Sequence, residues 1–449
     1  MNYVKLLAYF RLKTYKTTVR REFSAGFTTF LTMVYIVPVN MLIMSAAGMP
    51  KEALLTATAL ITIFSCILNG IWANIPVALS VGMGLNAYFT YGLCIGMGVP
   101  WQTALGAVFI AAAGLTALSL TNFRVWIMQT IPLDLRRAIS AGIGAFICFV
   151  GMKQMGFIVA SPATYVTIGN VSDPKVLVGV IGIIFVVSFW ALNLKGGFIL
   201  AVVATSLIAW FFDIYPAPSE IFSLPASIGP IFAQLDIIAA FKLSLAPAIL
   251  TIFITHLFDS MGTLTGVCNR AKLFDKEDKN NVKKIAKSLA CDASASMAGA
   301  VVGTSTVTAF AESASGVEAG GKTGLTAIFT GLLFILTLFL LPLFEAIPEN
   351  AIYPVLVMVG VLMFGELGKI NFSDPAICIA TFFTVMLMPL TYSITIGLSV
   401  AFMSYFMVNL VLRRWKNLNG GIITLTFISL LVFLAISAPR LFDKLLGTN

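Results

Sequence analysis

The chain has 449 residues, of which 59% are hydrophobic and 10% are charged, and its formal net charge is +9. A soluble globular protein carries about 25% charged residues, so this composition predicts a polytopic membrane protein and excludes an ordinary soluble domain. The Lys and Arg residues lie in short stretches between apolar runs, where they report membrane orientation rather than nucleic-acid binding. The sequence contains no nucleotide-binding motif, metal-ligand spacing or nucleophile–base pattern, so we expect no ATP-driven pump, cofactor, metal site or enzyme.

The apolar runs form two series separated by a proline-rich link. Residues 1–22 are basic and are predicted to be a cytoplasmic N-terminus of a protein in the cell membrane. Runs of roughly 18–25 residues, long enough to cross a bilayer, follow near 24–45, 52–73, 77–97, 101–120, 134–159, 175–193 and 196–213. After the extracytoplasmic link 214–241, a second series lies near 243–266, 282–302, 304–319, 322–344, 350–367, 374–390 and 392–412.

Charge placement supports a first repeat over 23–213 and a second repeat over 242–412. With the N-terminus inside, the basic loops fall on the cytoplasmic side, and of the outer links only 45–51 carries a basic residue, Lys51. An odd number of spans in each half makes the second half enter from the opposite face, which is the geometry of an inverted repeat. The C-terminal region 413–449 holds another apolar stretch, 420–438, which is an added span, a re-entrant segment or a sign that 374–412 is divided differently.

Two spans in corresponding positions have sequences that do not favour a continuous helix. The third begins at Ile75 with IPVALSVGMGLNAYF, and the tenth begins at Gly303 with GTSTVTAFAES. An extended backbone is favoured there, and at membrane depth it is tolerated only where it is buried in protein or lines a wet cavity. Paired interruptions indicate a transport site at which half-helix N-termini face one solute. Each interruption carries a polar residue, Asn86 in the third span and Glu312 in the tenth.

Ionisable side chains within the apolar runs are rare and costly in a membrane, so each is a candidate site residue. Glu312 is predicted to line the solute site and to carry a proton. His256 and Asp259 are three residues apart, so they share one helix face. His256 is the only histidine in the chain; it is either a satisfied core group or a group that binds a solute or exchanges a proton. For Asp292, which lies among small residues, we predict a structural role.

Four blocks of the sequence resemble one family. They read MVYIVPVN at 33–40, GMGLNAYFTYG at 82–92, LFDSMGTLTGV at 257–267 and GTSTVTAFAESASGVEAGGKTGLTA at 303–327. Together they closely resemble the AzgA-like adenine/guanine/hypoxanthine permeases of the nucleobase–ascorbate transporter superfamily. The resemblance implies an all-α polytopic membrane fold with about fourteen segments in two inverted repeats. It also implies core and gate domains, a short strand in the third and tenth segments, and uptake of a purine base with a proton. Asn86, Asp259 and Glu312 match positions important in that family.

One departure from the family bears on the substrate. The eighth segment of the family usually reads F-V-D-x-F-D-T-x-G-T, and His256 stands here in place of the first acid, a principal purine contact. A carboxylate accepts hydrogen bonds from ring N–H and amine groups, whereas a neutral histidine offers one donor and one acceptor. Two hypotheses therefore stay open. One is a proton-coupled purine importer with an elevator-type mechanism, and the other is a carrier of a different small solute, such as an organic or inorganic anion, on the same fold.

Under the first hypothesis, the substrate-binding residues are Asn86, His256, Asp259, Phe310, Glu312, Thr306 and Tyr88, and the proton-coupling residues are Glu312, Asp259 and His256. The rings of Tyr88 and Phe310 are predicted to stack on the base. The expected partners are a small purine, protons and the lipid bilayer, with no nucleic acid. Related folds often pair through the gate domain, so a homodimer is also expected.

Overall fold

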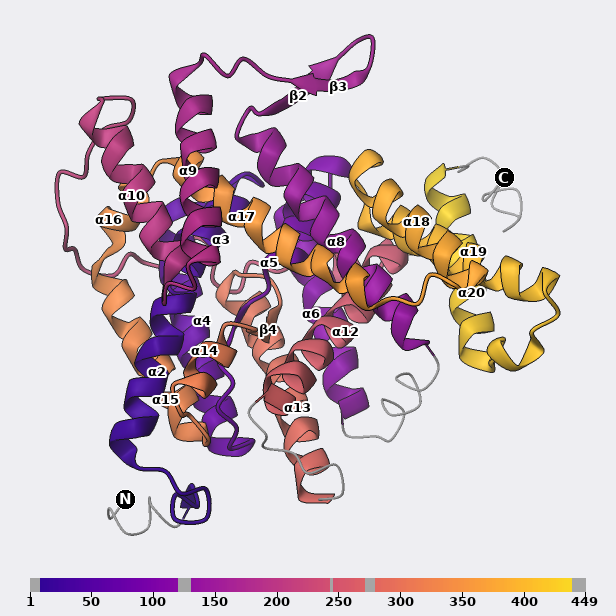
Figure 1. Cartoon of the computed structure of the whole chain (residues 1–449), viewed down its shortest axis with the longest axis horizontal. Coiled ribbons are helices and arrows are strands. Elements are labelled where there is room, and N and C mark those ends of the chain that lie inside the picture. The colour runs from indigo at the N-terminus through magenta and orange to yellow at the C-terminus, as the bar shows by residue number, and fades with distance from the viewer. Residues whose placement is uncertain (1–8, 120–130, 243–244, 271–278, 438–449) are drawn as a thin grey trace.

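The computed structural model describes residues 9–119, 131–242, 245–270 and 279–437, which fold mainly as helices (Figure 1). Within these ranges, nine helices are long and apolar enough to cross a membrane, and four shorter apolar helices accompany them. The chain is a multi-pass membrane protein, as its composition predicts. Parts of the predicted N-terminal and C-terminal regions, 1–8 and 438–449, lie outside the described residues.

The helices form two groups, each packed mainly within itself. The first group consists of α2 (Val19–Met33), α3 (Ile36–Ser45), α4 (Lys51–Trp72), β1 (Leu79–Val81), α5 (Met83–Ala87), η1 (Tyr88–Gly96), α6 (Trp101–Ser119), α12 (Ala246–Arg270), α13 (Lys279–Val302), β4 (Val307–Ala309), α14 (Ser313–Glu318), α15 (Gly324–Leu333) and η3 (Phe334–Phe339). The second group consists of α8 (Leu133–Gln154), α9 (Pro174–Ala191), α10 (Gly197–Phe211), α17 (Glu349–Phe364), α18 (Pro375–Leu390), α19 (Ile394–Val411) and α20 (Gly420–Ser437). The short helix α16 (Leu341–Ala346) connects η3 to α17.

The first span begins before the apolar run does, and it is broken. Thr18 caps α2 because its hydroxyl oxygen accepts the N–H of Arg21, and an acidic residue, Glu22, lies in the first turn, where the helix dipole favours it. The helix therefore starts at Val19 rather than near 24. A turn at Tyr35 then separates α2 from α3, where the sequence predicted one continuous span.

The interruptions of the third and tenth spans meet as an antiparallel pair of short strands, β1 and β4. The register is centred on Ser80 and Thr308 and pairs Leu79 with Ala309, Ser80 with Thr308, and Val81 with Val307. All of these residues are buried. The α4 side chain Ser65 donates to the Leu79 carbonyl at 2.8 Å, so extended backbone deep in the protein is paired from both sides. A short helix follows each strand: α5, which continues as the π-helical η1, and α14.

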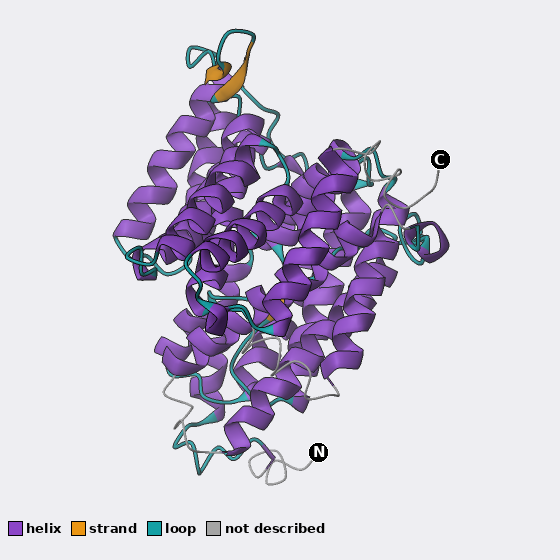
Figure 2. Ribbon diagram, turned by 90° about the vertical axis from the view of Figure 1, so that its right-hand side faces the viewer, coloured by secondary structure: helices purple, strands orange, loops and turns teal. Residues whose placement is uncertain are grey.

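An exposed hairpin stands where the fifth span was predicted to end. The apolar run extended to 159, but α8 ends at Gln154, and Gly156 follows with φ +78°, a conformation that favours glycine. The next residues form β2 (Ile158–Ser161), which pairs with β3 (Tyr165–Ile168). Both strands are rich in β-branched residues, which favour an extended backbone. Figure 2 shows this hairpin at the end of the molecule opposite the N-terminal region.

The link 214–241 contains one short helix, α11 (Ile237–Ala240). Its backbone N–H groups donate to carbonyls at the ends of three spans: Ser223 to Phe339, Ala233 to Val301 and Asp236 to Gln102. The link therefore connects η3, the end of α13 and the start of α6 through hydrogen bonds.

Glycines allow close helix contacts within both groups. A Cβ added at Gly324 of α15 would lie 2.0 Å from the carbonyl oxygen of Gly70 in α4, and one at Gly144 of α8 would lie 2.6 Å from that of Gly360 in α17. Neither distance leaves room for a side chain. Small residues at these contacts are typical of helices that pack inside a membrane.

Candidate functional site

Glu312 lies where the extended segment after β4 turns into α14. It occupies the N-cap position, yet its side chain does not cap the helix. Its Oε1 atom instead accepts a hydrogen bond of 2.5 Å from the hydroxyl of Tyr35, at the turn between α2 and α3. The side chain is half-buried. A carboxylate has several acceptor positions, so Glu312 retains capacity to accept a donor from a solute.

The turn that follows α14 is fixed to the start of α2 by Glu22. The Oε1 atom of Glu22 accepts hydrogen bonds from the Thr17 hydroxyl at 2.8 Å and the Lys322 N–H at 3.1 Å. Its Oε2 atom accepts from the N–H and hydroxyl of Thr323, at 3.2 and 2.9 Å, and from the Thr326 hydroxyl at 2.6 Å. The described hydrogen bond of Lys322 is therefore made by its backbone N–H to Glu22.

Between these two contacts, α14 lies directly on α2. A Cβ added at Gly316 would be 2.0 Å from the hydroxyl oxygen of Thr29 and 2.7 Å from the carbonyl oxygen of Ala25. The position of Glu312 is therefore set by the first span at three levels: the Glu22 carboxylate, the Gly316 contact and the Tyr35 hydroxyl.

His256 is buried in α12 and is paired with Asp292 of α13. Its Nε2 atom lies 3.2 Å from Asp292 Oδ1, and the two side chains are 1% and 2% exposed. Ser296, one turn along α13, lies 3.4 Å from the same nitrogen and also holds β4, because its hydroxyl oxygen accepts the Val307 N–H at 2.8 Å. This cluster connects α12, α13 and β4.

Asp259 is half-buried one turn after His256 on α12. It lies within electrostatic range of His256, Asp292 and Glu312. The helix that carries it packs against both β4 and α14. The structure therefore brings the three predicted proton-coupling residues into one region, although direct contacts among them are not observed in the described part of the chain.

Asn86 lies in a separate buried polar cluster. Its amide N–H donates to the side-chain oxygen of Asn40 in α3. The Asn40 amide in turn donates to the hydroxyls of Thr58, at 2.7 Å, and Thr304, at 3.3 Å. The side-chain oxygen of Asn86 has no hydrogen-bond partner among the described residues, so an acceptor remains available in this buried position.

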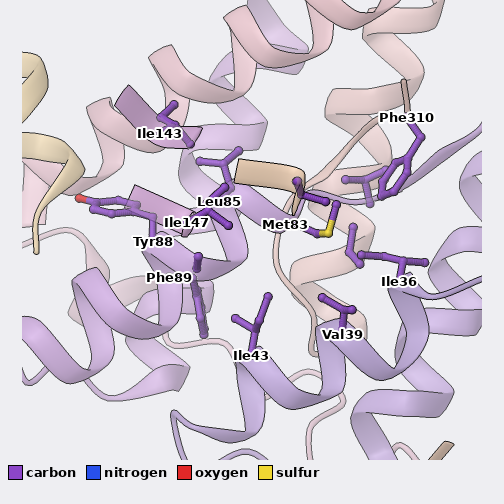
Figure 3. Close-up of a cluster of buried hydrophobic side chains, with 14 of the residues drawn as sticks. Ile36, Val39, Ile43, Met83, Leu85, Tyr88, Phe89, Ile143, Ile147 and Phe310 are labelled. Carbon is purple, nitrogen blue, oxygen red and sulfur yellow. The ribbon is translucent and has the colours of Figure 1, made fainter. Parts of the chain in front are cut away.

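The aromatic candidates occupy different parts of the hydrophobic cluster beside α5. Figure 3 shows Phe310 close to Met83 on one side, and Tyr88 pointing away on the other. The Tyr88 hydroxyl is hydrogen-bonded to Thr395 of α19 at 2.6 Å, which connects the two helix groups. Thr306, beside β4, is buried, and its hydroxyl is unpaired among the described residues.

A small pocket lies between α6, α12 and α13. Its polar lining residues include His256, Ser260 and Asp292, and leucines and a phenylalanine supply most of the rest. The buried Nδ1 of His256 and the Ser260 hydroxyl have no hydrogen-bond partner in the described part of the chain. The pocket therefore combines an apolar wall with two free polar atoms.

Comparison with known proteins decides the family. Residues 20–376 match the model of the permease family. The chain is 41% identical over 428 residues to the adenine permease AdeP of Escherichia coli strain K12, covering 95% of each protein. It is 38% identical over 408 residues to the guanine/hypoxanthine permease PbuG of Bacillus subtilis strain 168, covering 88% of this chain and 92% of that one.

The chain belongs to the AzgA-like adenine/guanine/hypoxanthine permease family. The fold of this permease is also similar to that of a solved structure, the transmembrane domain of a cyanobacterial bicarbonate transporter, BicA. The TM-score is 0.63 at 14% sequence identity, and the match covers 84% of this chain and 96% of that domain. At this identity the likeness concerns the fold alone. The relatives in sequence do not favour the alternative hypothesis of an anion as cargo.

Several residues that shape the site of this permease were not predicted from its sequence. Tyr35 and Asn40 both lie in MVYIVPVN, a block that contributed to the family resemblance, so that block was an available signal. Ser296 is one of several small residues in α13, and no pattern distinguished it. The sequence predicts Glu22 as the last residue of the basic N-terminal region, whereas the structure places it, fully buried, within α2.

Proposed function

We propose that this protein imports a purine base, such as adenine, guanine or hypoxanthine, together with a proton across the cell membrane. The observation that carries this proposal is the similarity over nearly the whole chain to permeases named for adenine and for guanine/hypoxanthine. The buried strand pair with Glu312 beside it supports the proposal, because interrupted spans surround solute sites in secondary transporters.

We propose that the N-terminus is cytoplasmic and that the chain has about fourteen segments in two inverted repeats, over 23–213 and 242–412. In this arrangement α2–α3 corresponds to α12, α4 to α13, and β1–α5–η1 to β4–α14. The antiparallel register centred on Ser80 and Thr308 supports an axis between the repeats. The link 214–241 supports the same membrane orientation. It is hydrogen-bonded to three span ends that all lie on the extracytoplasmic side in this topology. In this scheme α20 is an additional segment.

The substrate in this proposal lies between α12 and the strand pair. Glu312 accepts a ring N–H and carries the coupled proton, and Asp259 and His256 provide polar contacts from α12. Asn86 and Thr306 offer unpaired polar atoms near the two interruptions. Phe310 contributes an apolar ring surface against which a base can stack, and Tyr88 lies where the helix groups meet.

We propose that transport moves the first helix group, as a core domain, against the second, as a gate domain. The packing within each group supports this division. Contacts between the groups include the Tyr88–Thr395 hydrogen bond, at 2.6 Å, and the hydrogen bond that Thr251 of α12 donates to Thr395, at 3.2 Å. Hydroxyl contacts of this kind can exchange partners during a movement with little loss of energy.

Uptake of radiolabelled adenine, guanine and hypoxanthine, in cells that lack their own purine carriers, tests the proposal. We expect saturable uptake that rises as the external pH falls and that a protonophore abolishes. We expect Glu312→Gln to lower uptake at least about tenfold, the effect of losing one hydrogen bond to a charged group. Glu220→Gln, an exposed change in the link, is the matched control and should have no effect.

Competition defines the cargo class in the same assay. Excess unlabelled purines should abolish the uptake of label, whereas sulfate and small organic acids should not. Uptake no greater than in cells without the protein, or competition by anions alone, would overturn the proposal. Unchanged rate and pH dependence in Glu312→Gln would remove Glu312 from the mechanism.

A further inference from the structure

The side chain of His256 has two nitrogens in different surroundings. Nε2 faces α13, where Asp292 Oδ1 lies at 3.2 Å and Ser296 Oγ at 3.4 Å. Nδ1 is buried and has no hydrogen-bond partner among the described residues. The tautomer of a neutral histidine is set by the hydrogen bond that one of its nitrogens makes, so these surroundings decide which nitrogen carries the proton.

With Asp292 ionised and His256 neutral, the hydrogen-bonding roles around Nε2 leave one consistent arrangement. The Asp292 carboxylate can only accept hydrogen bonds. If Nε2 carried no proton, its lone pair would point at the lone pairs of the carboxylate oxygen. The Ser296 hydroxyl has a single proton, and backbone carbonyls of Asp292 and Val307 both lie 3.0 Å from its oxygen. The same oxygen accepts the Val307 N–H. Ser296 therefore uses its proton on backbone, and Nε2 must supply its own.

We propose that Asp292 is a positioning residue that fixes neutral His256 with its proton on Nε2, so that Nδ1 is a buried hydrogen-bond acceptor. Asp292 thereby acts on the solute through the histidine, rather than serving only to join helices. Among the described residues, Asp259, on the same helix, lies within electrostatic range of both members of the pair and of Glu312. The described residues of α6 (Trp101–Ser119) and β4, which also pack on α12, carry no charged side chain.

The consequence for substrate choice rests on the proposed function. The family's usual carboxylate at this position offers two acceptor oxygens, whereas a histidine held in this tautomer offers one acceptor and no donor toward the solute. A base that presents a single N–H to Nδ1 can form a hydrogen bond with it. A base that presents an acceptor there would place its lone pair against the lone pair of Nδ1. Asp292 and His256 together then form the specificity-determining element that replaces the usual acid.

His256 is the only histidine in the chain, so protein labelled with ¹⁵N-histidine and purified through a histidine-free tag reports this side chain alone by NMR. We expect the proton of the unmodified protein on Nε2, with Nδ1 unprotonated. In Asp292→Asn the amide can donate to Nε2, and we expect the proton to shift toward Nδ1. The control, Asp173→Asn, changes an exposed cap of α9 and should leave the spectrum unchanged. A proton on Nδ1 in the unmodified protein, or an identical tautomer in Asp292→Asn, would overturn the proposal.

A double-mutant cycle separates positioning from a structural role. We expect Asp292→Asn to raise the purine KM about 10–100-fold, as loss of a residue that orients a histidine does in other sites. In a His256→Asn background the same change should have no further effect on KM, because Asp292 acts through the histidine. An equal loss in both backgrounds would show that Asp292 only holds α13 and β4. The NMR result stands even if the protein takes up no purine, so failure of the proposed function is recognised separately.

Discussion

The buried carboxylate of Glu22 allows a quantitative prediction about how α14 is held. Replacement by Ala removes the acceptor of two hydrogen bonds on one oxygen and three on the other. The hydroxyls can turn toward other acceptors, but the N–H groups of Lys322 and Thr323 cannot. Each buried donor without a partner costs about 1–3 kcal/mol, so the two together cost about 2–6 kcal/mol. We predict that Glu22→Ala lowers the free energy of unfolding by about 4 kcal/mol, the middle of that range.

Chemical unfolding of the purified protein in detergent, followed by intrinsic tryptophan fluorescence, measures this change. Glu22→Gln keeps one acceptor oxygen but replaces the other with an amide group, which cannot accept from the N–H groups nearby. We expect it to lower the free energy of unfolding by about half as much as Glu22→Ala. Glu52→Ala, at the exposed start of α4, is the matched control and should cost less than about 1 kcal/mol. If Glu22→Ala were no less stable than Glu52→Ala, the hydrogen bonds described for Glu22 would not hold α14 on α2.

Two further substitutions probe the same support. Tyr35→Phe removes the hydroxyl that donates to Glu312, and we predict about a tenfold loss in the initial rate of purine uptake, equivalent to about 1.4 kcal/mol. The control, Tyr165→Phe in the exposed hairpin, should have no effect. Equal uptake rates in the two variants would show that the Tyr35–Glu312 hydrogen bond does not support transport. Gly316→Ala places a methyl group 2.0 Å from a hydroxyl of α2, and we predict a thermal-shift loss that corresponds to about 1–3 kcal/mol. At Gly262, where the described residues leave open space, the same change should not destabilise the protein.

The general plan of the fold could be predicted because hydrophobic length and charge placement are local properties of the sequence. Most of the predicted spans match helices over most of their length, and the third and tenth contain the strands β1 and β4. The deviations have local causes that a count of apolar residues does not register. Gly156, with its positive φ, ends α8 before the apolar run ends, and Thr18 starts α2 inside the basic region.

The site was predictable only in part, because its contacts join residues far apart in the sequence. The polar residues at the interruptions could be recognised by their position in apolar runs. Tyr35 and Glu312 are separated by 277 positions, and a single sequence contains no signal that pairs them. The pairing of His256 with Asp292 is also absent from the prediction, which gives Asp292 a structural role on the basis of its small neighbours.

The location of a bound base is the most direct measure of whether the two interrupted spans surround the substrate. We propose determining the structure of the full chain, purified in lipid nanodiscs, with adenine or hypoxanthine bound. We predict density for the base between α12 and the strands β1 and β4, within hydrogen-bonding distance of the Glu312 carboxylate. A base bound outside this region, with Glu312 still paired only to Tyr35, would contradict the mechanism proposed for this permease.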